Sequence, residues 1–187
     1  VHVYNPANGW IQNCNSTPFT VSSASSPDRN AYPNYMAPDA ENARGIHADR
    51  VLRSESAFTL DKLITVSQDS YLPGFEKLLP SLIEAYDASI ATNDTIRIKL
   101  AEPIAILRTW DFRYSVSSVP TTLAIFWAQR LKQDVMSRIP LRIDQLSQIE
   151  FLQTKSSPSE KLKALSEALQ ELKKDFGTWK QPWGEIN

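Results

Sequence analysis

The chain has 187 residues, of which 42% are hydrophobic and 22% are charged, and its formal net charge is −1. This length and composition are typical of a globular protein with a core of its own. The acids and bases are interspersed, so nothing indicates a nucleic acid or an anionic membrane surface as a partner, and no apolar run approaches the ~18 residues that span a bilayer.

The first residue of the chain, its single cysteine and its two histidines restrict the possible chemistry further. The sequence begins at Val1, without a methionine or a signal-like apolar segment, which predicts a processed product or a piece of a longer protein. Cys14 is the single cysteine, which excludes an internal disulfide and a cysteine metal cluster. His2 and His47 lack the helical spacing of a zinc pair, which argues against metal-assisted hydrolysis.

The amino-terminal part of the sequence is predicted to be an extended arm over residues 1–40. It holds five of the twelve prolines and many Ser, Asn and Asp residues, with short apolar pieces that could be strands. From about residue 41 the apolar residues recur at helical spacing, so we divide the chain into this arm and a helical domain over residues 41–187. The predicted class is mainly α, with five to seven helices behind an extended or short-strand arm.

Helix starts and buried stripes can be predicted in chain order. We expect N-caps at Thr59, at Asn93 or Asp94, at Ser118 with Pro120 in the first turn, and at Ser157 with Pro158 and the capping-box residue Glu160. The apolar stripes are Phe75, Leu78, Leu79, Leu82, Ile83 and Tyr86; Leu100, Ile104 and Leu107; and Leu162, Leu165, Leu169 and Leu172. Pro103 lies inside the second stripe, so a kink or a split into two helices is expected there. The last helix is predicted to end near Gly177.

The letters WIQNCN at residues 10–15 carry the densest set of candidate chemical groups. If these residues form a strand, Asn13 and Asn15 project from the same face, because side chains alternate along a strand. A carboxamide N–H fixed in this way can donate to a developing oxyanion. The alternative is that the asparagines only make turns between Gly9 and Pro18, and composition alone favours this alternative.

Three other side chains could act chemically, each with a structural alternative. Cys14 could be a nucleophile if a base lies close, but a lone cysteine is more often a small packing residue. His47 lies one turn from Arg50 on a predicted helix and could be a general base, although a lone histidine is more often structural. Arg50 could hold a carboxylate, whereas a salt bridge is the commoner role of a helical arginine.

Three segments follow one another in the order of a known family pattern: NPANGWIQNCNSTPF at 5–19, YMAPDAENARGIHADRVL at 35–52 and TWDFRYSVSSVPTTLAIFW at 109–127. Together they resemble the β-chain interior of the penicillin acylase family, whose NP…GyIxNxNnxP segment is followed by a helix with aDR and then by WD ahead of an apolar helix. These amino-terminal-nucleophile amidohydrolases include penicillin G acylase, cephalosporin acylases and acyl-homoserine-lactone acylases. The resemblance implies an interior piece of an αββα enzyme that hydrolyses the amide of a small N-acylated substrate.

The resemblance also implies roles for individual residues. By position in the motif, Asn15 matches the asparagine that donates to the oxyanion, and Arg50 matches the arginine that orders the active site. Some members bind a structural calcium, and counting back from Arg50 places Asp39 at one of its ligands. An N-cap of the following helix suits Asp39 better than this calcium role. No cofactor is required for the reaction.

The nucleophile of the family is a serine at the start of the β chain, whose own α-amino group is the base. Val1 cannot take that role, so the resemblance implies that the nucleophile, the second oxyanion donor and much of the acyl pocket lie upstream. The expected partners are therefore the rest of the same precursor, namely its α chain and the amino-terminal part of its β chain. Alone, the chain is predicted to be inactive and to self-associate through an exposed strand edge.

Two further expectations concern the location of the parent enzyme and an alternative, non-catalytic function. Family members are commonly periplasmic or secreted, which is the expected location of the parent enzyme. A second hypothesis, from another class, is a helical binding module without catalysis. Its asparagine-rich arm would dock a partner, and the apolar surface facing that arm would form a contiguous exposed patch.

Overall fold

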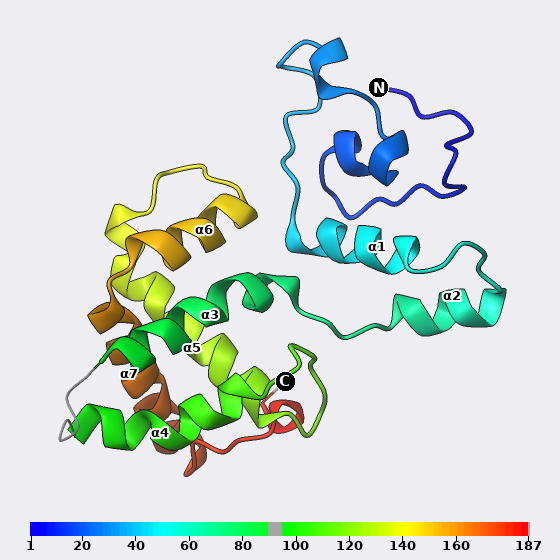
Figure 1. Cartoon of the computed structure of the whole chain (residues 1–187). Coiled ribbons are helices and arrows are strands. Elements are labelled where there is room, and N and C mark those ends of the chain that lie inside the picture. The colour runs from blue at the N-terminus through cyan, green and yellow to red at the C-terminus, as the bar shows by residue number, and fades with distance from the viewer. Residues whose placement is uncertain (90–94, 187) are drawn as a thin grey trace. The chain divides into compact units, whose positions relative to one another are not determined.

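The chain folds into helices joined by irregular segments (Figure 1), and the computed structural model describes residues 1–89 and 95–186. The chain divides into two compact units. Unit 1 comprises Val1–Asp69 with Asp144–Leu146, and unit 2 comprises Ser70–Ile143 with Ser147–Asn187. The predicted class, mainly α, is confirmed.

Unit 1 holds short 3-10 helices, labelled η, in otherwise irregular chain before its first α-helix. Its elements are η1 (Pro18–Thr20), η2 (Ser23–Ser25), η3 (Arg29–Ala31), α1 (Ala43–Arg53) and α2 (Leu60–Ser67). Asn42 caps α1, and Thr59 caps α2 as predicted, each by accepting a hydrogen bond from a first-turn N–H. The change from irregular chain to helix falls close to residue 41, while the compact unit continues to Asp69. A domain boundary at residue 40 stays a prediction.

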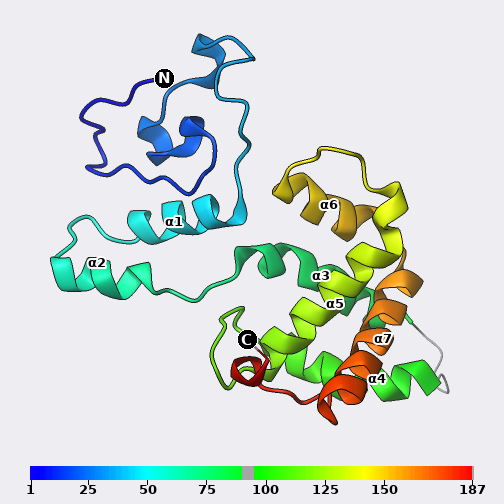
Figure 2. The same ribbon diagram turned by 180° about the vertical axis from the view of Figure 1, so that it is seen from behind.

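Unit 2 holds the remaining helices, except for the first two residues of α6: α3 (Pro73–Ala88), α4 (Thr95–Arg108), α5 (Val119–Val135), η4 (Met136–Arg138), α6 (Gln145–Lys155), α7 (Pro158–Phe176) and η5 (Trp183–Glu185). Helices α5 and α7 pack against each other, and α3 and α4 also contact α7 (Figure 2). An isolated antiparallel bridge joins Tyr71 to Arg113. Within the described ranges, no helix has both the length and the apolar character needed to cross a bilayer.

The predicted apolar stripes form the core of unit 2. Its large buried side chains are Leu78, Leu79, Leu82, Leu100, Ile104, Leu107, Leu123, Trp127, Leu131, Leu165, Leu169 and Leu172. Trp127 on α5 is 0% exposed, and its indole Nε1–H donates to the Lys161 carbonyl on α7 at 3.1 Å. This large, fully buried side chain therefore fills space between α5 and α7 without leaving its polar atom unsatisfied.

Two further helix ends follow the predicted capping signals. Ser118 Oγ accepts a hydrogen bond from Thr121 N–H at the start of α5. Gly177 ends α7 with a φ of 78°, a left-handed conformation that glycine adopts without a steric penalty. The cap predicted at Asn93 or Asp94 lies outside the described residues.

Helix α4 contains Pro103, where a kink or a split was expected. It runs from Thr95 to Arg108 as one element, so the split is not found and the kink stays a prediction. Leu100, on the amino-terminal side of the proline, is buried in the core, and so are the residues that follow it in the stripe. Because both flanking turns are anchored in this way, the helix persists although the proline removes one backbone hydrogen bond.

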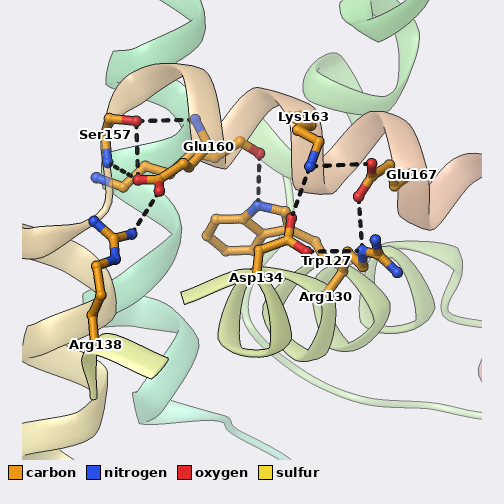
Figure 3. Close-up of polar contacts among 9 residues, drawn as sticks. Trp127, Arg130, Asp134, Arg138, Ser157, Glu160, Lys163 and Glu167 are labelled. Atoms are coloured by element: carbon orange, nitrogen blue, oxygen red, sulfur yellow. Dashed lines mark hydrogen bonds and ion pairs between the residues drawn. The ribbon is translucent and has the colours of Figure 1, made fainter. Parts of the chain in front are cut away.

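Helix α7 begins with the predicted capping box (Figure 3). Ser157 Oγ accepts from Glu160 N–H at 3.2 Å, and Glu160 Oε2 accepts from Ser157 N–H at 2.7 Å. Arg138 Nη2 donates to the other carboxylate oxygen of Glu160 at 2.6 Å. The Ser157 N–H, and after it the Arg138 guanidinium, hold the pKa of the Glu160 carboxyl below its ordinary value.

Glu160→Gln is expected to reduce the acid sensitivity of the fold. Because folding lowers the pKa of Glu160, its carboxylate stabilises the folded state above the ordinary glutamate pKa of about 4.3, and this contribution is lost as the pH falls through the lowered pKa. Glutamine can keep the capping hydrogen bonds but cannot titrate. Thermal unfolding measured between neutral and acid pH should show a smaller fall in Tm for the variant than for the wild type.

The matched control for this prediction is Glu171→Gln, at an exposed residue of the same helix, which should keep the wild-type pH dependence. A Glu160→Gln protein with the wild-type slope of Tm against pH would show that the capping box does not contribute to acid sensitivity.

Candidate functional site

In unit 1, the loop of residues 13–17 lies against the amino-terminal end of α1. Asn42 joins the two. Its Oδ1 accepts from Gly45 N–H at 2.9 Å, and its Nδ2 donates to the Cys14 carbonyl at 2.9 Å and to the Asn15 carbonyl at 3.4 Å. One carboxamide therefore caps the helix and holds the loop at the same time.

The backbone of this loop turns sharply at Asn15. Its φ is 54°, in the left-handed region, which asparagine tolerates better than most residues. Asn13 Oδ1 accepts from Asn15 N–H at 3.0 Å, and Thr17 N–H donates to the Ala40 carbonyl at 3.2 Å. The position of Asn15 is thus determined by a side-chain turn within the loop and by bonds to the chain just before α1.

Of the two alternatives for residues 10–15, the strand is not found. Residues 10–13 have no regular structure, and residues 14–16 form a bend. Gln12 N–H donates to the Val21 carbonyl at 2.8 Å, but this bond does not continue into a ladder, which a strand needs in order to be stable. The asparagines are presented by a turn, as the alternative interpretation expected.

Gly45 allows the loop to approach the first turn of α1. The residue is buried, and a Cβ built there would lie 2.9 Å from Ser16 Oγ and closer still to the Glu41 carboxylate. A larger residue would have to displace the Glu41 side chain and the loop. The loop can therefore pack closely against the helix only because Gly45 has no side chain.

The Asn15 side chain is exposed, and its Oδ1 accepts a hydrogen bond from Arg44 Nη2 at 3.3 Å. A guanidinium has only donors, so it binds the oxygen end of the carboxamide. In the part of the chain that the structure describes, no intramolecular hydrogen bond is formed by Asn15 Nδ2. The nitrogen end is therefore the part of this amide that can donate to a ligand.

Arg50 lies nearer the carboxyl-terminal end of α1, where it lines an open pocket of about 350 Å³. The pocket is formed by Phe19, Thr20, Ser23, Glu41, Ile46, Asp49, Arg50 and Arg53. Since a helix rises ~1.5 Å per residue, the backbone of Arg50 lies about 9 Å further along α1 than that of Arg44. The structure places Asn15 and Arg50 on the same unit but does not bring them together in this pocket.

His47 and Cys14 have surroundings that suit structural roles. His47 Nε2 lies 3.1 Å from Asp69 Oδ1, and the two side chains are 18% and 24% exposed. Cys14 is half-buried, and among the described residues no base is hydrogen-bonded to its thiol. A cysteine nucleophile needs such an activating neighbour. The geometry therefore favours the structural interpretation of both residues.

Asp39 is exposed in irregular chain ahead of α1. The N-cap of this helix is Asn42, so the capping role predicted for Asp39 is wrong; Asn42 supplies the acceptor that bonds the first-turn N–H of Gly45. The described residues contain no group of three His, Cys, Asp or Glu side chains that could hold a metal ion. Calcium takes 6–8 oxygen ligands, so Asp39 would need ligands from elsewhere, and this calcium site stays a prediction.

Two residues that hold the candidate donor in place, Asn42 and Arg44, were not found by sequence reasoning. Asn42 carried a usable signal, since asparagine is a favoured N-cap and stands directly before a helical pattern. Arg44 carried none, because its hydrogen bond to Asn15 joins residues that are 29 positions apart in the sequence.

The chain matches the family model of penicillin amidase over residues 1–187. This match places it in the class of amide hydrolases. The chain belongs to the penicillin amidase family. No curated protein matches it.

Asn42→Asp is expected to loosen the loop while keeping the helix cap. The carboxylate still accepts from Gly45 N–H at the positive end of α1, but it cannot donate to the carbonyls of Cys14 and Asn15. Hydrogen exchange followed by mass spectrometry should show faster exchange in peptides covering residues 13–17 and unchanged exchange in α1.

Two further variants complete this test. Asn42→Ala removes both interactions, so it should expose α1 as well as the loop and lose about 1 kcal/mol of helix capping. Asn34→Asp introduces the same charge at an exposed position of unit 1 and should leave both segments unchanged. Wild-type exchange of the loop in Asn42→Asp would contradict the role assigned to the Asn42 amide.

Proposed function

We propose that the chain is an interior part of an N-acyl amide hydrolase of the penicillin acylase or acyl-homoserine-lactone acylase type, with Asn15 as an oxyanion donor. Family membership supports amide hydrolysis. The observation that supports the donor role is the geometry of Asn15: it is exposed, its backbone is held in a turn, and its Oδ1 is bound by Arg44. The origin of this piece from an αββα enzyme is part of the proposal.

The proposed reaction begins at a serine upstream of this chain, at the start of the β chain. The serine Oγ attacks the amide carbonyl carbon, and the serine α-amino group takes the hydroxyl proton. The carbonyl oxygen becomes negatively charged in the tetrahedral intermediate, where Asn15 Nδ2–H and a backbone N–H elsewhere donate to it. The intermediate then expels the amine, which receives the proton, and water releases the acyl group from the serine.

This donation accelerates the reaction because it is stronger to the oxyanion than to the neutral carbonyl oxygen of the bound substrate. A donor that is already oriented adds to the effect, since no reorganisation is needed as the charge develops. The proposed role of Arg50 is separate: it helps to order the active site from the pocket that it lines with Glu41 and Asp49.

The proposed partner is the rest of the same acylase precursor, its α chain and the amino-terminal part of its β chain. The surface of helix α2 supports this proposal, because the helix has no buried residue. Its apolar residues Leu60, Leu63 and Ile64 are 73%, 44% and 51% exposed. Exposed apolar side chains grouped on one helix are usually covered by a partner. A periplasmic or secreted location of the parent enzyme is also part of the proposal.

The same apolar side chains would also suit the alternative function, a helical binding module without catalysis. The two functions differ in what Asn15 does. A binding module contributes nothing to amide hydrolysis, so its asparagine could be replaced without kinetic consequence.

Asn15→Ala in the whole acylase is expected to lower kcat by about 10²–10³, with KM little changed, because the donor acts mainly in the transition state. Asn13→Ala is the matched control: Asn13 supports the turn through its Oδ1, so its loss should reduce kcat much less. Complete separation of the α and β chains on a gel would show that both variants still fold and process themselves. A wild-type kcat for Asn15→Ala would exclude the donor role.

The 187-residue chain alone is expected to show no turnover of a chromogenic N-acyl amide, because the reaction proposed above needs a serine nucleophile from the rest of the acylase. Hydrolysis is measured by absorbance at high enzyme concentration, and the whole acylase is the positive control. Turnover that Cys14→Ser abolishes would contradict this expectation and would support a cysteine mechanism instead.

A further inference from the structure

The side chain that contacts the Asn15 carboxamide comes from the first turn of α1. Arg44 is the second residue of the helix and is exposed, and its Nη2 donates to Asn15 Oδ1 at 3.3 Å. The backbone on both sides of this contact is fixed by Asn42, which caps α1 and binds the Cys14 carbonyl. The two groups are therefore held facing each other by the same local network.

A carboxamide can point either its oxygen or its nitrogen at a ligand. The two ends have opposite effects on an oxyanion, since Nδ2–H donates to the negative oxygen whereas Oδ1 repels it. A guanidinium offers five N–H donors and no acceptor, so Arg44 can bind only the oxygen end of Asn15. Its contact favours the single orientation in which Nδ2 is left for the ligand.

The charge of Arg44 acts in the same direction. A hydrogen bond to the amide oxygen draws electron density from the nitrogen and makes its N–H a stronger donor. The amino-terminal end of α1 contributes a partial positive charge of its own, which does not depend on Arg44.

Both residues break a local rule of protein structure. Arg44 places a cation at the positive end of a helix whose first turn holds no acidic residue, which is unfavourable for the helix. Asn15 adopts a positive φ, which a residue other than glycine rarely does. Local choices that reduce stability and converge on one contact are typical of functional sites.

We propose that Arg44 is a positioning residue for the oxyanion donor: it binds Asn15 Oδ1, and thereby directs and strengthens the Nδ2–H that donates in the transition state. This inference rests on the proposed function of Asn15. It assigns the contact with the donor to Arg44, at the start of α1, and not to Arg50, which lines the pocket further along the helix.

The test is a double-mutant cycle in the whole acylase, with kcat, KM and Tm measured for each protein. Arg44→Met keeps the aliphatic stem and removes the charge and all donors. It should lower kcat by about 10 to 10² with little change in KM, as expected when a catalytic group is misplaced. Arg44→Lys retains one positively charged donor group and should recover part of the loss.

Two readouts separate positioning from a general structural role. In the Asn15→Ala background, Arg44→Met should change kcat by less than about twofold, because the group that Arg44 positions is already gone. The Tm of Arg44→Met should equal or exceed that of the wild type, since an unfavourable charge is removed from the positive end of α1. Arg142→Met, at an exposed arginine of unit 2, is the matched control and should behave as the wild type.

Each outcome decides one of the two proposals. A wild-type kcat for Asn15→Ala would overturn the proposed function. If Asn15→Ala is impaired as expected, the inference about Arg44 fails on any of three results. These are a wild-type kcat for Arg44→Met, fully additive losses in the double variant, or a fall in Tm that accounts for the loss of activity.

Discussion

The geometry of the candidate site depends on one bifunctional side chain, the carboxamide of Asn42. The loop of residues 13–17 belongs to no helix or strand, so its shape must come from hydrogen bonds to its surroundings. Besides the turn at Asn13 and the bond from Thr17 to Ala40, Asn42 supplies the bonds that tie the loop to α1, by accepting from Gly45 N–H and donating to the Cys14 carbonyl. An aspartate at this position would cap α1 equally well, but its carboxylate could not donate to the loop, whereas the amide of Asn42 accepts with its oxygen and donates with its nitrogen at the same time.

Unit 2 owes its structure to burial and capping, in contrast to unit 1. Trp127 and the leucines of α3, α4, α5 and α7 form one core, and the ends of α5 and α7 are defined by caps and a terminal glycine. These features give unit 2 a stable helical scaffold whether or not it takes part in catalysis. Unit 1 has few buried apolar residues and relies on polar contacts, which is the usual character of segments that carry function.

Most of the helices could be predicted from the sequence, because their signals are local and repeated. The stripes of leucines, the caps at Thr59, Ser118 and Ser157 and the stop at Gly177 each depend on residues within one or two turns. The site could be predicted only in part. The motif drew attention to Asn15, but its presentation by a turn and its bond to Arg44 depend on contacts between distant residues, which no local pattern contains.

The central claim is that Asn15 Nδ2 donates to the oxyanion while Arg44 holds the oxygen end of the same amide. The most direct measurement is a crystal structure of the whole acylase with a boronic acid bound to its catalytic serine, since the tetrahedral boronate oxygen occupies the position of the oxyanion. The account predicts Asn15 Nδ2 about 2.7–3.1 Å from that oxygen, with Oδ1 on Arg44. A boronate oxygen held by other donors, with Asn15 turned away from it, would contradict the account.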